Sequence, residues 1–181
     1  LMILGLFAYQ MVLADKYYKT FNIDVDKVSL NITKRTKGII IVHYSGLPCD
    51  IASITRIAKK NDLFVIEDAA HAMGASYKGR RIGNYSDATI FSFYATKNLA
   101  TGEGGMVVTR NKTLSDKVRR MSYFGIDRKA FDRHKKNNWY YEVVELGYKF
   151  NMDNIHAAIG LSQLKILDKN NKKRRTLAKL Y

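Results

Sequence analysis

Short β-branched runs alternate with segments of helical spacing through the middle of the chain. Four runs predict strands: "KGIIIVHYSG", "LFVIED", "DATIFSFYA" and "GGMVVTR". The first has the pattern of a strand covered on both faces. Between the first two runs, helical spacing relates Ile51, Ile54, Ile57 and Ala58. Asp50 precedes them as a candidate N-cap, so a helix is predicted there.

The rest of the chain contains further helical segments. "AAHAMGA" predicts a short helical turn closed by Gly74. "LSDKVRRMSYFG" predicts a helix that stops at Gly125, with Leu114, Val118 and Met121 at helical spacing. From Met152 onward a last helix is predicted, with Asp153 near its start and Ile155, Ile159 and Ile166 on one stripe. Residues 126–147 are polar and aromatic and are expected to be irregular.

Strand, helix and strand in this order predict an α/β domain with a mostly parallel sheet. A single proline, Pro48, and the lack of a Ser/Gly-rich linker leave no internal domain boundary. We therefore expect one domain over residues 1–181 and no second domain within the chain.

The composition is that of a soluble globular protein, with 46% hydrophobic and 26% charged residues among 181. The one cysteine, Cys49, excludes an intramolecular disulfide and fits a reducing, cytoplasmic location, with Cys49 as a small buried residue. No CxxC or HExxH pattern occurs, so no metal site is expected. The opening "LMILGLFAYQMVLA" is shorter than the roughly 20 residues that span a bilayer, so no membrane partner is expected.

The net charge of +15 suits a nucleic acid, an anionic membrane surface or an acidic small substrate. Much of it lies in the final "KNNKKRRTLAKLY", which we interpret as a solvated helix face. No aromatic residue interleaves with the basic run itself, which argues against binding to single-stranded nucleic acid.

Three polar side chains fall at or just beyond predicted strand ends: Asp68, Ser92 and Lys97. In parallel sheets, ligands bind at the carboxyl ends of the strands, so these groups are expected to converge on one crevice. Asp68 is either an N-cap of the following turn or a buried carboxylate that pairs with a protonated pyridine nitrogen. Ser92 is either a core hydroxyl or a phosphate contact.

Lys97 and His71 extend this group. The amine of Lys97 must be neutral to attack an aldehyde, and burial beside other cations would lower its pKa in that direction. His71 lies about one helical turn after Asp68, so it either faces the same ligand or is structural. "TGEGG" at 101–105 predicts a tight turn into the next strand, and it matches neither a P-loop nor GxGxxG.

These residues lie in a block that resembles the DegT/DnrJ/StrS sugar aminotransferases, which are pyridoxal-phosphate enzymes of fold type I. The block is "VIEDAAHAMGASYKGRRIGNYSDATIFSFYATKNLATGEGGMVVT". The similarity continues upstream in "TKRTKGIIIVHYSGLPCD" and downstream in "LGYKFNMDNIHAAIGLSQLKILD". It covers nearly everything from about Thr20 to the end, and it implies the three-layer α/β/α large domain of that fold.

The resemblance also implies roles for single residues. Lys97 would bond to the aldehyde of pyridoxal 5′-phosphate and act as acid and base in the proton shift. Asp68 would pair with the pyridine nitrogen, with His71 beside the ring and Ser92 on the phosphate. Lys149 and Asn151 would reach the cofactor phosphate of a neighbouring subunit, which implies a homodimer with a shared active site.

The implied reaction transfers an amino group from an amino acid, usually glutamate, to a nucleotide-linked keto-sugar. Such chemistry serves amino-sugar and cell-surface polysaccharide biosynthesis. Relatives that dehydrate instead carry histidine in place of the lysine, so Lys97 favours amino transfer.

Some family features have no counterpart here. The chain lacks a Gly-Thr pair that binds the cofactor phosphate, and it reads Gln10 and Met11 where relatives have Lys-Pro. The small carboxyl-terminal domain is also missing, so the chain is expected to be the middle of the large domain, cut at both ends. Two alternatives stay open: an inactive fragment of such an enzyme, and a basic nucleic-acid-binding module.

Overall fold

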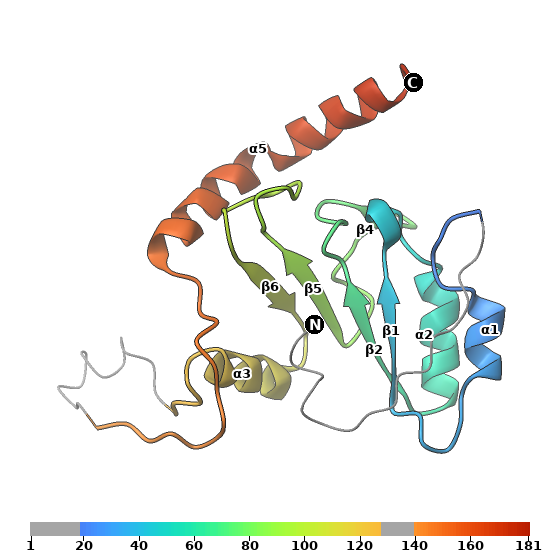
Figure 1. Ribbon diagram of the computed structural model, residues 1–181. Coiled ribbons are helices and arrows are strands. Elements are labelled where there is room, and N and C mark those ends of the chain that lie inside the picture. Colours follow the sequence, from blue (N-terminus) through green and yellow to red (C-terminus); the bar gives the residue numbers. More distant parts are fainter. Residues whose placement is uncertain (1–18, 128–139) are drawn as a thin grey trace.

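A computed structural model describes residues 19–127 and 140–181 (Figure 1). The apolar opening segment and residues 128–139 of the expected irregular region lie outside these ranges. Within the described ranges, no helix combines the length and the apolar character needed to cross a membrane.

A four-stranded sheet forms the centre of the molecule. It consists of β1 (Gly38–Val42), β2 (Phe64–Asp68), β5 (Ala88–Ser92) and β6 (Gly105–Val108), in the order β1-β2-β5-β6. The first three strands are parallel, and β6 runs antiparallel to β5. All four strands fall in the runs that predicted them, and the expected α/β fold with a mostly parallel sheet is confirmed.

The described residues form four helices outside the sheet: α1 (Val25–Leu30), α2 (Ile51–Lys60), α3 (Lys112–Met121) and α5 (Asn154–Ala178). Each begins after an Asp or Asn whose side chain accepts a backbone N–H of the first turn, because the first amides of a helix lack intrahelical partners. These caps are Asp24, Asp50, Asn111 and Asp153. The predictions of Asp50 and Asp153 as helix starts are confirmed.

The two faces of the sheet differ in burial. One face packs against α2, and α1 in turn packs on α2. Its inward side chains include Ile41 and Val65, and α2 contributes Ile51 and Ile54 to the same core. The opposite face is more open: five of its apolar side chains are 39–50% exposed, namely Ile40, Val42, Phe64, Ile90 and Val107.

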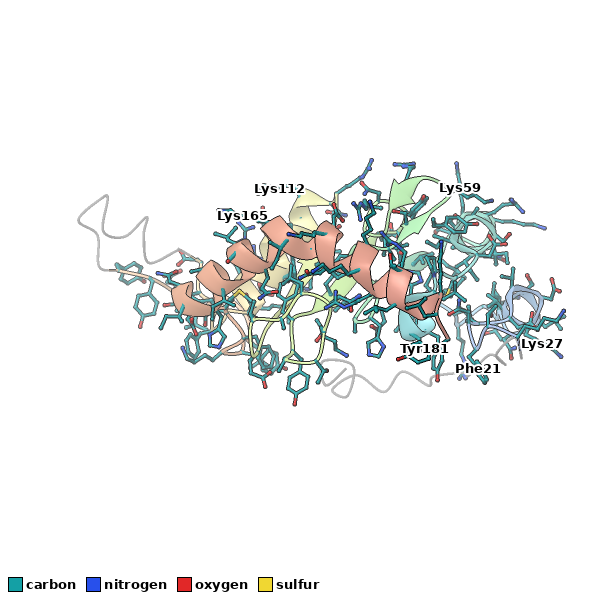
Figure 2. The ribbon with its side chains drawn as sticks, turned by 90° about the horizontal axis from the view of Figure 1, so that it is seen from above. Phe21, Lys27, Lys59, Lys112, Lys165 and Tyr181 are labelled. Atoms are coloured by element: carbon teal, nitrogen blue, oxygen red, sulfur yellow. The ribbon has the colours of Figure 1, made fainter. Side chains whose placement is uncertain are left out.

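The long helix α5 crosses the edge of the sheet where β1, β2 and β5 end (Figure 1, orange to red; Figure 2, from above). Its only buried residues in the described part of the chain are Leu167 and Asn171. Asn171 donates to the carbonyl of Met73 (3.2 Å), and Asp168 pairs through both oxygens of its carboxylate with Arg81 (2.9 Å). These contacts fix α5 against the segment that follows β2.

The stripe predicted for α5 is therefore not the side that packs. Ile155, Ile159 and Ile166 are 72%, 42% and 43% exposed. The helix contacts the sheet layer through a different set of positions, centred on Leu167, so helical spacing located the helix without locating its buried face.

The segment after β2 also departs from prediction. Residues 69–75 form two successive turns rather than a helical turn, closed by backbone hydrogen bonds from Ala72 to Ala69 and from Ala75 to Ala72. Gly74 ends the segment with a φ of +83°, as its position predicted. A β-hairpin follows, made of β3 (Ser76–Tyr77) and β4 (Arg80–Arg81). Its two-residue loop consists of Lys78 and Gly79, both at positive φ.

A polar cluster lies inside the otherwise apolar core. Glu67 has no exposed surface, and its carboxylate accepts hydrogen bonds from His43 (2.8 Å), Ser86 (2.5 Å) and Thr89 (3.1 Å). The amide of Cys49 donates to His43 Nδ1 (3.1 Å), so Nδ1 carries no proton and Nε2–H is the donor to Glu67. His43 is therefore neutral and Glu67 is the charged partner.

The environment of Glu67 has opposing effects on its pKa. Burial acts to raise the pKa, but the hydrogen bonds from His43, Ser86 and Thr89 outweigh it and hold the pKa below the ordinary 4.5. Burial likewise raises the pKa of the Cys49 thiol to about 11, which agrees with the expected small buried residue.

The segments that follow β1 and β2 come into close backbone contact at Gly46. It closes the 3₁₀ turn η2 (Tyr44–Gly46) at φ +85°, and a Cβ there would lie 2.7 Å from the carbonyl oxygen of His71. Gly79 has a similar φ of +79° with open space around it.

We predict that Gly79→Ala lowers the free energy of unfolding by about 1–2 kcal/mol, for backbone strain alone. Gly46→Ala should cost about 1–3 kcal/mol more. Urea unfolding measures both, and equal costs would contradict the close contact.

Glu67→Gln tests the buried charge. Because folding lowers the pKa of Glu67, its stabilising contribution is complete above the ordinary value of 4.5 and is lost as pH falls through the lower folded value. We predict that Glu67→Gln lowers the free energy of unfolding by about 1–3 kcal/mol at pH 7. The gap to the wild type should begin to narrow at about pH 5.5, one unit above the ordinary value, and continue to narrow as the pH falls through the lower folded value. Ser86→Ala keeps the charge but removes one of the hydrogen bonds that lower the Glu67 pKa, so its stability should still fall with falling pH, and the fall should be complete at a higher pH than in the wild type. A gap for Glu67→Gln that stays constant with pH would show that Glu67 is protonated in the core.

Candidate functional site

Asp68 is the last residue of β2, and its side chain lies on the open face of the sheet. It is paired in register with Val42 of β1 and Ile90 of β5, whose side chains are about half exposed. Asp68 Oδ1 accepts the amide of Ala70 (3.0 Å), which forms a local turn rather than a helix N-cap. No described residue donates to Oδ2, so one carboxylate oxygen remains available to a ligand.

Ser92 ends β5 on the same face. It lies two residues beyond Ile90, the partner of Asp68, and alternate residues of a strand share a face. Ser92 is half-buried, and within the described ranges its hydroxyl accepts only a long hydrogen bond, from the amide of Tyr94 (3.4 Å). Asp68 and Ser92 therefore stand on neighbouring strands at one edge of the sheet.

Lys97 lies in the turn that follows β5, with a half-buried side chain. Its amide donates to the carbonyl of Tyr94 (2.9 Å). Leu99, 3% exposed, anchors the turn in the core, and Thr101 bonds back to Phe93 through its amide (2.8 Å). The turn is thus held at both ends close to the edge that carries Asp68 and Ser92.

The glycine-rich segment 101–105 forms the tight turn that the sequence predicted. Gly102 and Gly104 adopt φ of +92° and +134°, which other residues rarely adopt. A Cβ on Gly104 would lie 2.5 Å from the methyl of Met152, which precedes α5. Glycine therefore allows the Lys97 turn and the start of α5 to approach each other.

His71 lies in the turn after β2, and its side chain is exposed. No hydrogen bond joins it to Asp68 in the described part of the chain. Its carbonyl instead faces Gly46, which brings the segments after β1 and β2 together. A place for His71 beside a bound ring stays a prediction.

Lys149 and Asn151 lie apart from this group. Lys149 pairs with Tyr123 in an isolated bridge after α3, its Nζ is 5.6 Å from the centre of the Phe124 ring, and Asn151 is exposed. Among residues 19–127 and 140–181, no hydrogen bond or ion pair links either to Asp68, Ser92 or Lys97. One chain therefore assembles three of the six predicted site residues at one edge, with His71 next to them in sequence.

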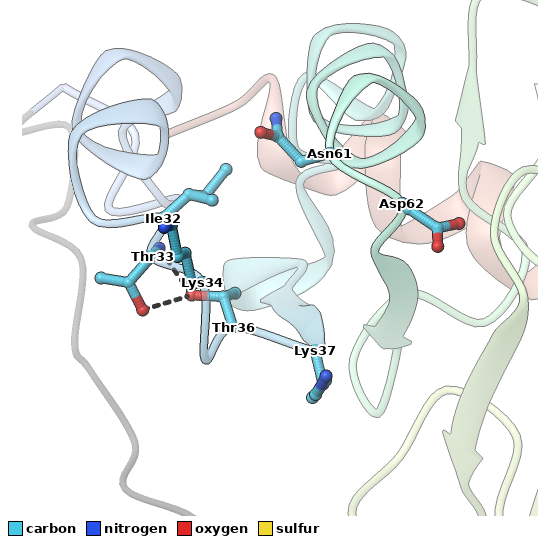
Figure 3. A pocket seen from close by; sticks show the side chains of 7 residues that line it. All are labelled: Ile32, Thr33, Lys34, Thr36, Lys37, Asn61 and Asp62. Atoms are coloured by element: carbon cyan, nitrogen blue, oxygen red, sulfur yellow. Dashed lines mark hydrogen bonds between the residues drawn. The ribbon is translucent and has the colours of Figure 1, made fainter.

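Two hollows in the described surface lie elsewhere. The one drawn in Figure 3 is at the amino end of the sheet, because Lys37 directly precedes β1. Its Lys37 and Asp62 side chains point away from each other, and the hydrogen bonds drawn between its lining residues join Thr33 and Thr36. A second hollow lies between β4 and α5, where Arg81 is already paired with Asp168. Neither contains the sequence-predicted residues.

The residues at the carboxyl edge fit pyridoxal phosphate by their chemistry. Asp68 has a carboxylate oxygen without a protein donor among the described residues, which suits a protonated ring nitrogen. Ser92 offers a hydroxyl, which suits a phosphate oxygen, and Lys97 offers a primary amine, which suits an aldehyde. All three belong to the ends of β2 and β5 or the turn beyond.

Sequence reasoning missed two residues that build this edge, His43 and Glu67. A glutamate inside the apolar strand "FVIED" was the available signal, because alternation places it on the face opposite Asp68. A charged residue on the covered face of a strand requires buried hydrogen-bond donors. The donors come from the segment after β1, from β5 and from the segment before β5, which sequence spacing alone could not identify.

Comparisons with known proteins agree with the chemistry of this edge. The profile of the DegT/DnrJ/EryC1/StrS aminotransferase family matches residues 4–181. The spore coat polysaccharide biosynthesis protein SpsC of Bacillus subtilis is 50% identical over 171 residues, which cover 94% of this chain and 44% of SpsC.

Two solved structures show the same fold. One is PseC of Helicobacter pylori, an aminotransferase involved in the biosynthesis of pseudoaminic acid, at 34% identity and a TM-score of 0.81, covering 88% of this chain and 41% of PseC. The other is the putative sugar aminotransferase Spr1654 of Streptococcus pneumoniae in its PMP-form, at 31% identity and a TM-score of 0.84, covering 93% of this chain and 47% of Spr1654. The chain spans less than half the length of each of these relatives. The chain belongs to the DegT/DnrJ/EryC1/StrS aminotransferase family.

Proposed function

We propose that the chain forms the central, cofactor-binding part of a pyridoxal-phosphate-dependent sugar aminotransferase. The reaction transfers an amino group from an amino acid, glutamate, to a nucleotide-linked keto-sugar for amino-sugar and cell-surface polysaccharide biosynthesis. The observation that carries the proposal is the placement of Asp68, Ser92 and the Lys97 turn at one edge of the sheet. The family and the named activities of PseC and Spr1654 support it.

Each residue has a distinct task in this proposal. When bound, pyridoxal phosphate supplies an electron sink for the negative charge that develops beside the amino carbon. Asp68 holds the ring nitrogen in its protonated form through Oδ2, and Ser92 binds the phosphate. Lys97 would hold the aldehyde end of the cofactor through its amine, and the same amine would serve as the base and acid that moves the proton of the shift. His71 lies beside the ring.

A second copy of the chain completes the proposed site. Lys149 and Asn151 are exposed and apart from Asp68, so they are available to the cofactor phosphate of a partner subunit. The proposed enzyme is therefore a homodimer with a shared active site, and it works in the cytoplasm on small-molecule substrates. The net charge of +15 is compatible with anionic cofactor and substrate.

Lys97→Ala tests the bond to the cofactor. Addition of pyridoxal phosphate to the protein expressed from its own gene should give a visible absorbance band, and Lys97→Ala should abolish it because no other amine occupies that turn. Lys78→Ala, which removes an exposed lysine of the hairpin, is the matched control and should keep the band. A band that persists in Lys97→Ala, or no band in the wild type, would refute the assignment.

The amino donor is tested in two half-reactions. Glutamate added alone should bleach the visible band, and a nucleotide-linked keto-sugar should then restore it, because the amino group passes between the substrates in two steps. Spectra recorded after each addition measure this. Bleaching by another amino acid but not by glutamate would retain the aminotransferase and overturn the donor.

A further inference from the structure

Glu67 is a buried negative charge with no positive partner among the described residues. It is 0% exposed, and its one ion-pair contact is with His43, which the amide of Cys49 holds in the neutral form. Hydrogen bonds alone compensate the loss of hydration. Replacing a buried charge by apolar residues of similar volume often leaves the stability of a protein unchanged or higher. Stability alone therefore does not explain a charge at this position.

The position of this charge in the strand relates it to the candidate site. Glu67 and Asp68 are consecutive in β2, so their side chains project from opposite faces. A ring nitrogen bound at Asp68 Oδ2 would lie roughly 10 Å from the Glu67 carboxylate, given strand and hydrogen-bond dimensions. One positive group would then interact with two negative charges of the same strand end, with Asp68 by direct contact and with Glu67 through the sheet.

The hydrogen bonds around β2 fix this arrangement. The amide of His43 donates to the carbonyl of Asp68 (3.0 Å), and the amide of Ala69 donates to the carbonyl of Ile90 (2.8 Å). The Glu67 side chain adds a link from β2 to His43 after β1 and to Thr89 of β5. The distance between the two carboxylates is therefore set by the sheet and not by a mobile side chain.

We propose that Glu67 is a positioning residue for the reaction, and that its buried charge strengthens the binding of a protonated ring nitrogen at Asp68. The inference rests on the proposed function. Coulomb's law for charges about 10 Å apart at an effective dielectric constant of about 20 gives an effect on the order of tenfold in affinity. The effect acts on the ring nitrogen held by Asp68, and Glu67 itself touches no ligand.

The test compares two cofactors in two proteins. One cofactor is pyridoxal phosphate, and the other is its 1-deaza analogue, in which a C–H replaces the ring nitrogen while the aldehyde and phosphate remain. Equilibrium dialysis of the apo-protein, expressed from its own gene, gives the dissociation constant of each for the wild type and for Glu67→Gln. We expect Glu67→Gln to weaken pyridoxal phosphate about tenfold more than it weakens the analogue.

The variant should retain the cluster. The amide side chain introduced by Glu67→Gln can accept from His43 through its oxygen and donate to Ser86 and Thr89, whose hydroxyls rotate. If part of the protein unfolds, both dissociation constants rise by the same factor, so their ratio still reports the charge. Repulsion between Glu67 and the phosphate is also common to both cofactors and cancels.

Ser86→Ala is the matched control, because it loosens the same cluster and keeps the charge. Its ratio of dissociation constants should equal that of the wild type. Equal weakening of both cofactors by Glu67→Gln would overturn the inference and leave Glu67 a structural residue. Failure of the proposed function gives a different result: pyridoxal phosphate would then not bind to the wild type, or would bind without Lys97.

Discussion

The buried carboxylate of Glu67 constrains the centre of the sheet. Its oxygens accept hydrogen bonds from His43 after β1, from Thr89 of β5 and from Ser86 before β5, so they are satisfied only when β1, β2 and β5 lie side by side in one register. Since a desolvated carboxylate without donors is strongly unfavourable, other registers of these strands are penalised. The chosen register brings the carboxyl ends of the three strands to one edge. Because of this register, Asp68 and Ser92 lie on the same face of the sheet, and the Lys97 turn comes directly after Ser92 at the same edge.

The loops and α5 complete this edge by close backbone approaches. Gly46 lets the turn after β1 contact His71, and Gly104 lets the Lys97 turn contact the start of α5. Farther along, Leu167, Asp168 and Asn171 of α5 bind the segment after β2. One helix thus contacts the segments that follow both β2 and β5. The site residues are held by the core on one side and by α5 on the other.

The sequence predicted the fold well because its signals are local. The β-branched runs located all four strands of the central sheet, and Asp50 and Asp153 located two helix starts through caps that act within one turn. The buried face of α5 was not predictable, because Leu167 packs on residues far earlier in the chain. α1 and the hairpin at Lys78–Gly79 were too short for periodicity to indicate. The segment after Asp68 was expected to be a helical turn, but its hydrogen bonds close successive turns instead.

The candidate site divides in the same way. Asp68 and Ser92 end strands and Lys97 follows one, so their placement at one edge was predictable from the topology of parallel sheets. Glu67 and His43 act through a contact between two strands, and only the alternation of side chains in β2 hinted at it. Lys149 and Asn151 lie outside the edge formed by one chain, so their role depends on a second copy and stays a proposal.

The central claim is that the amine of Lys97 bonds to the cofactor at the edge that carries Asp68 and Ser92. Reductive trapping with borohydride tests it most directly. The protein is reduced in the presence of pyridoxal phosphate, digested, and its peptides are sequenced by mass spectrometry. We expect a pyridoxyl-phosphate group on Lys97 alone. A label on another lysine with Lys97 unmodified, or no label at all, would contradict it.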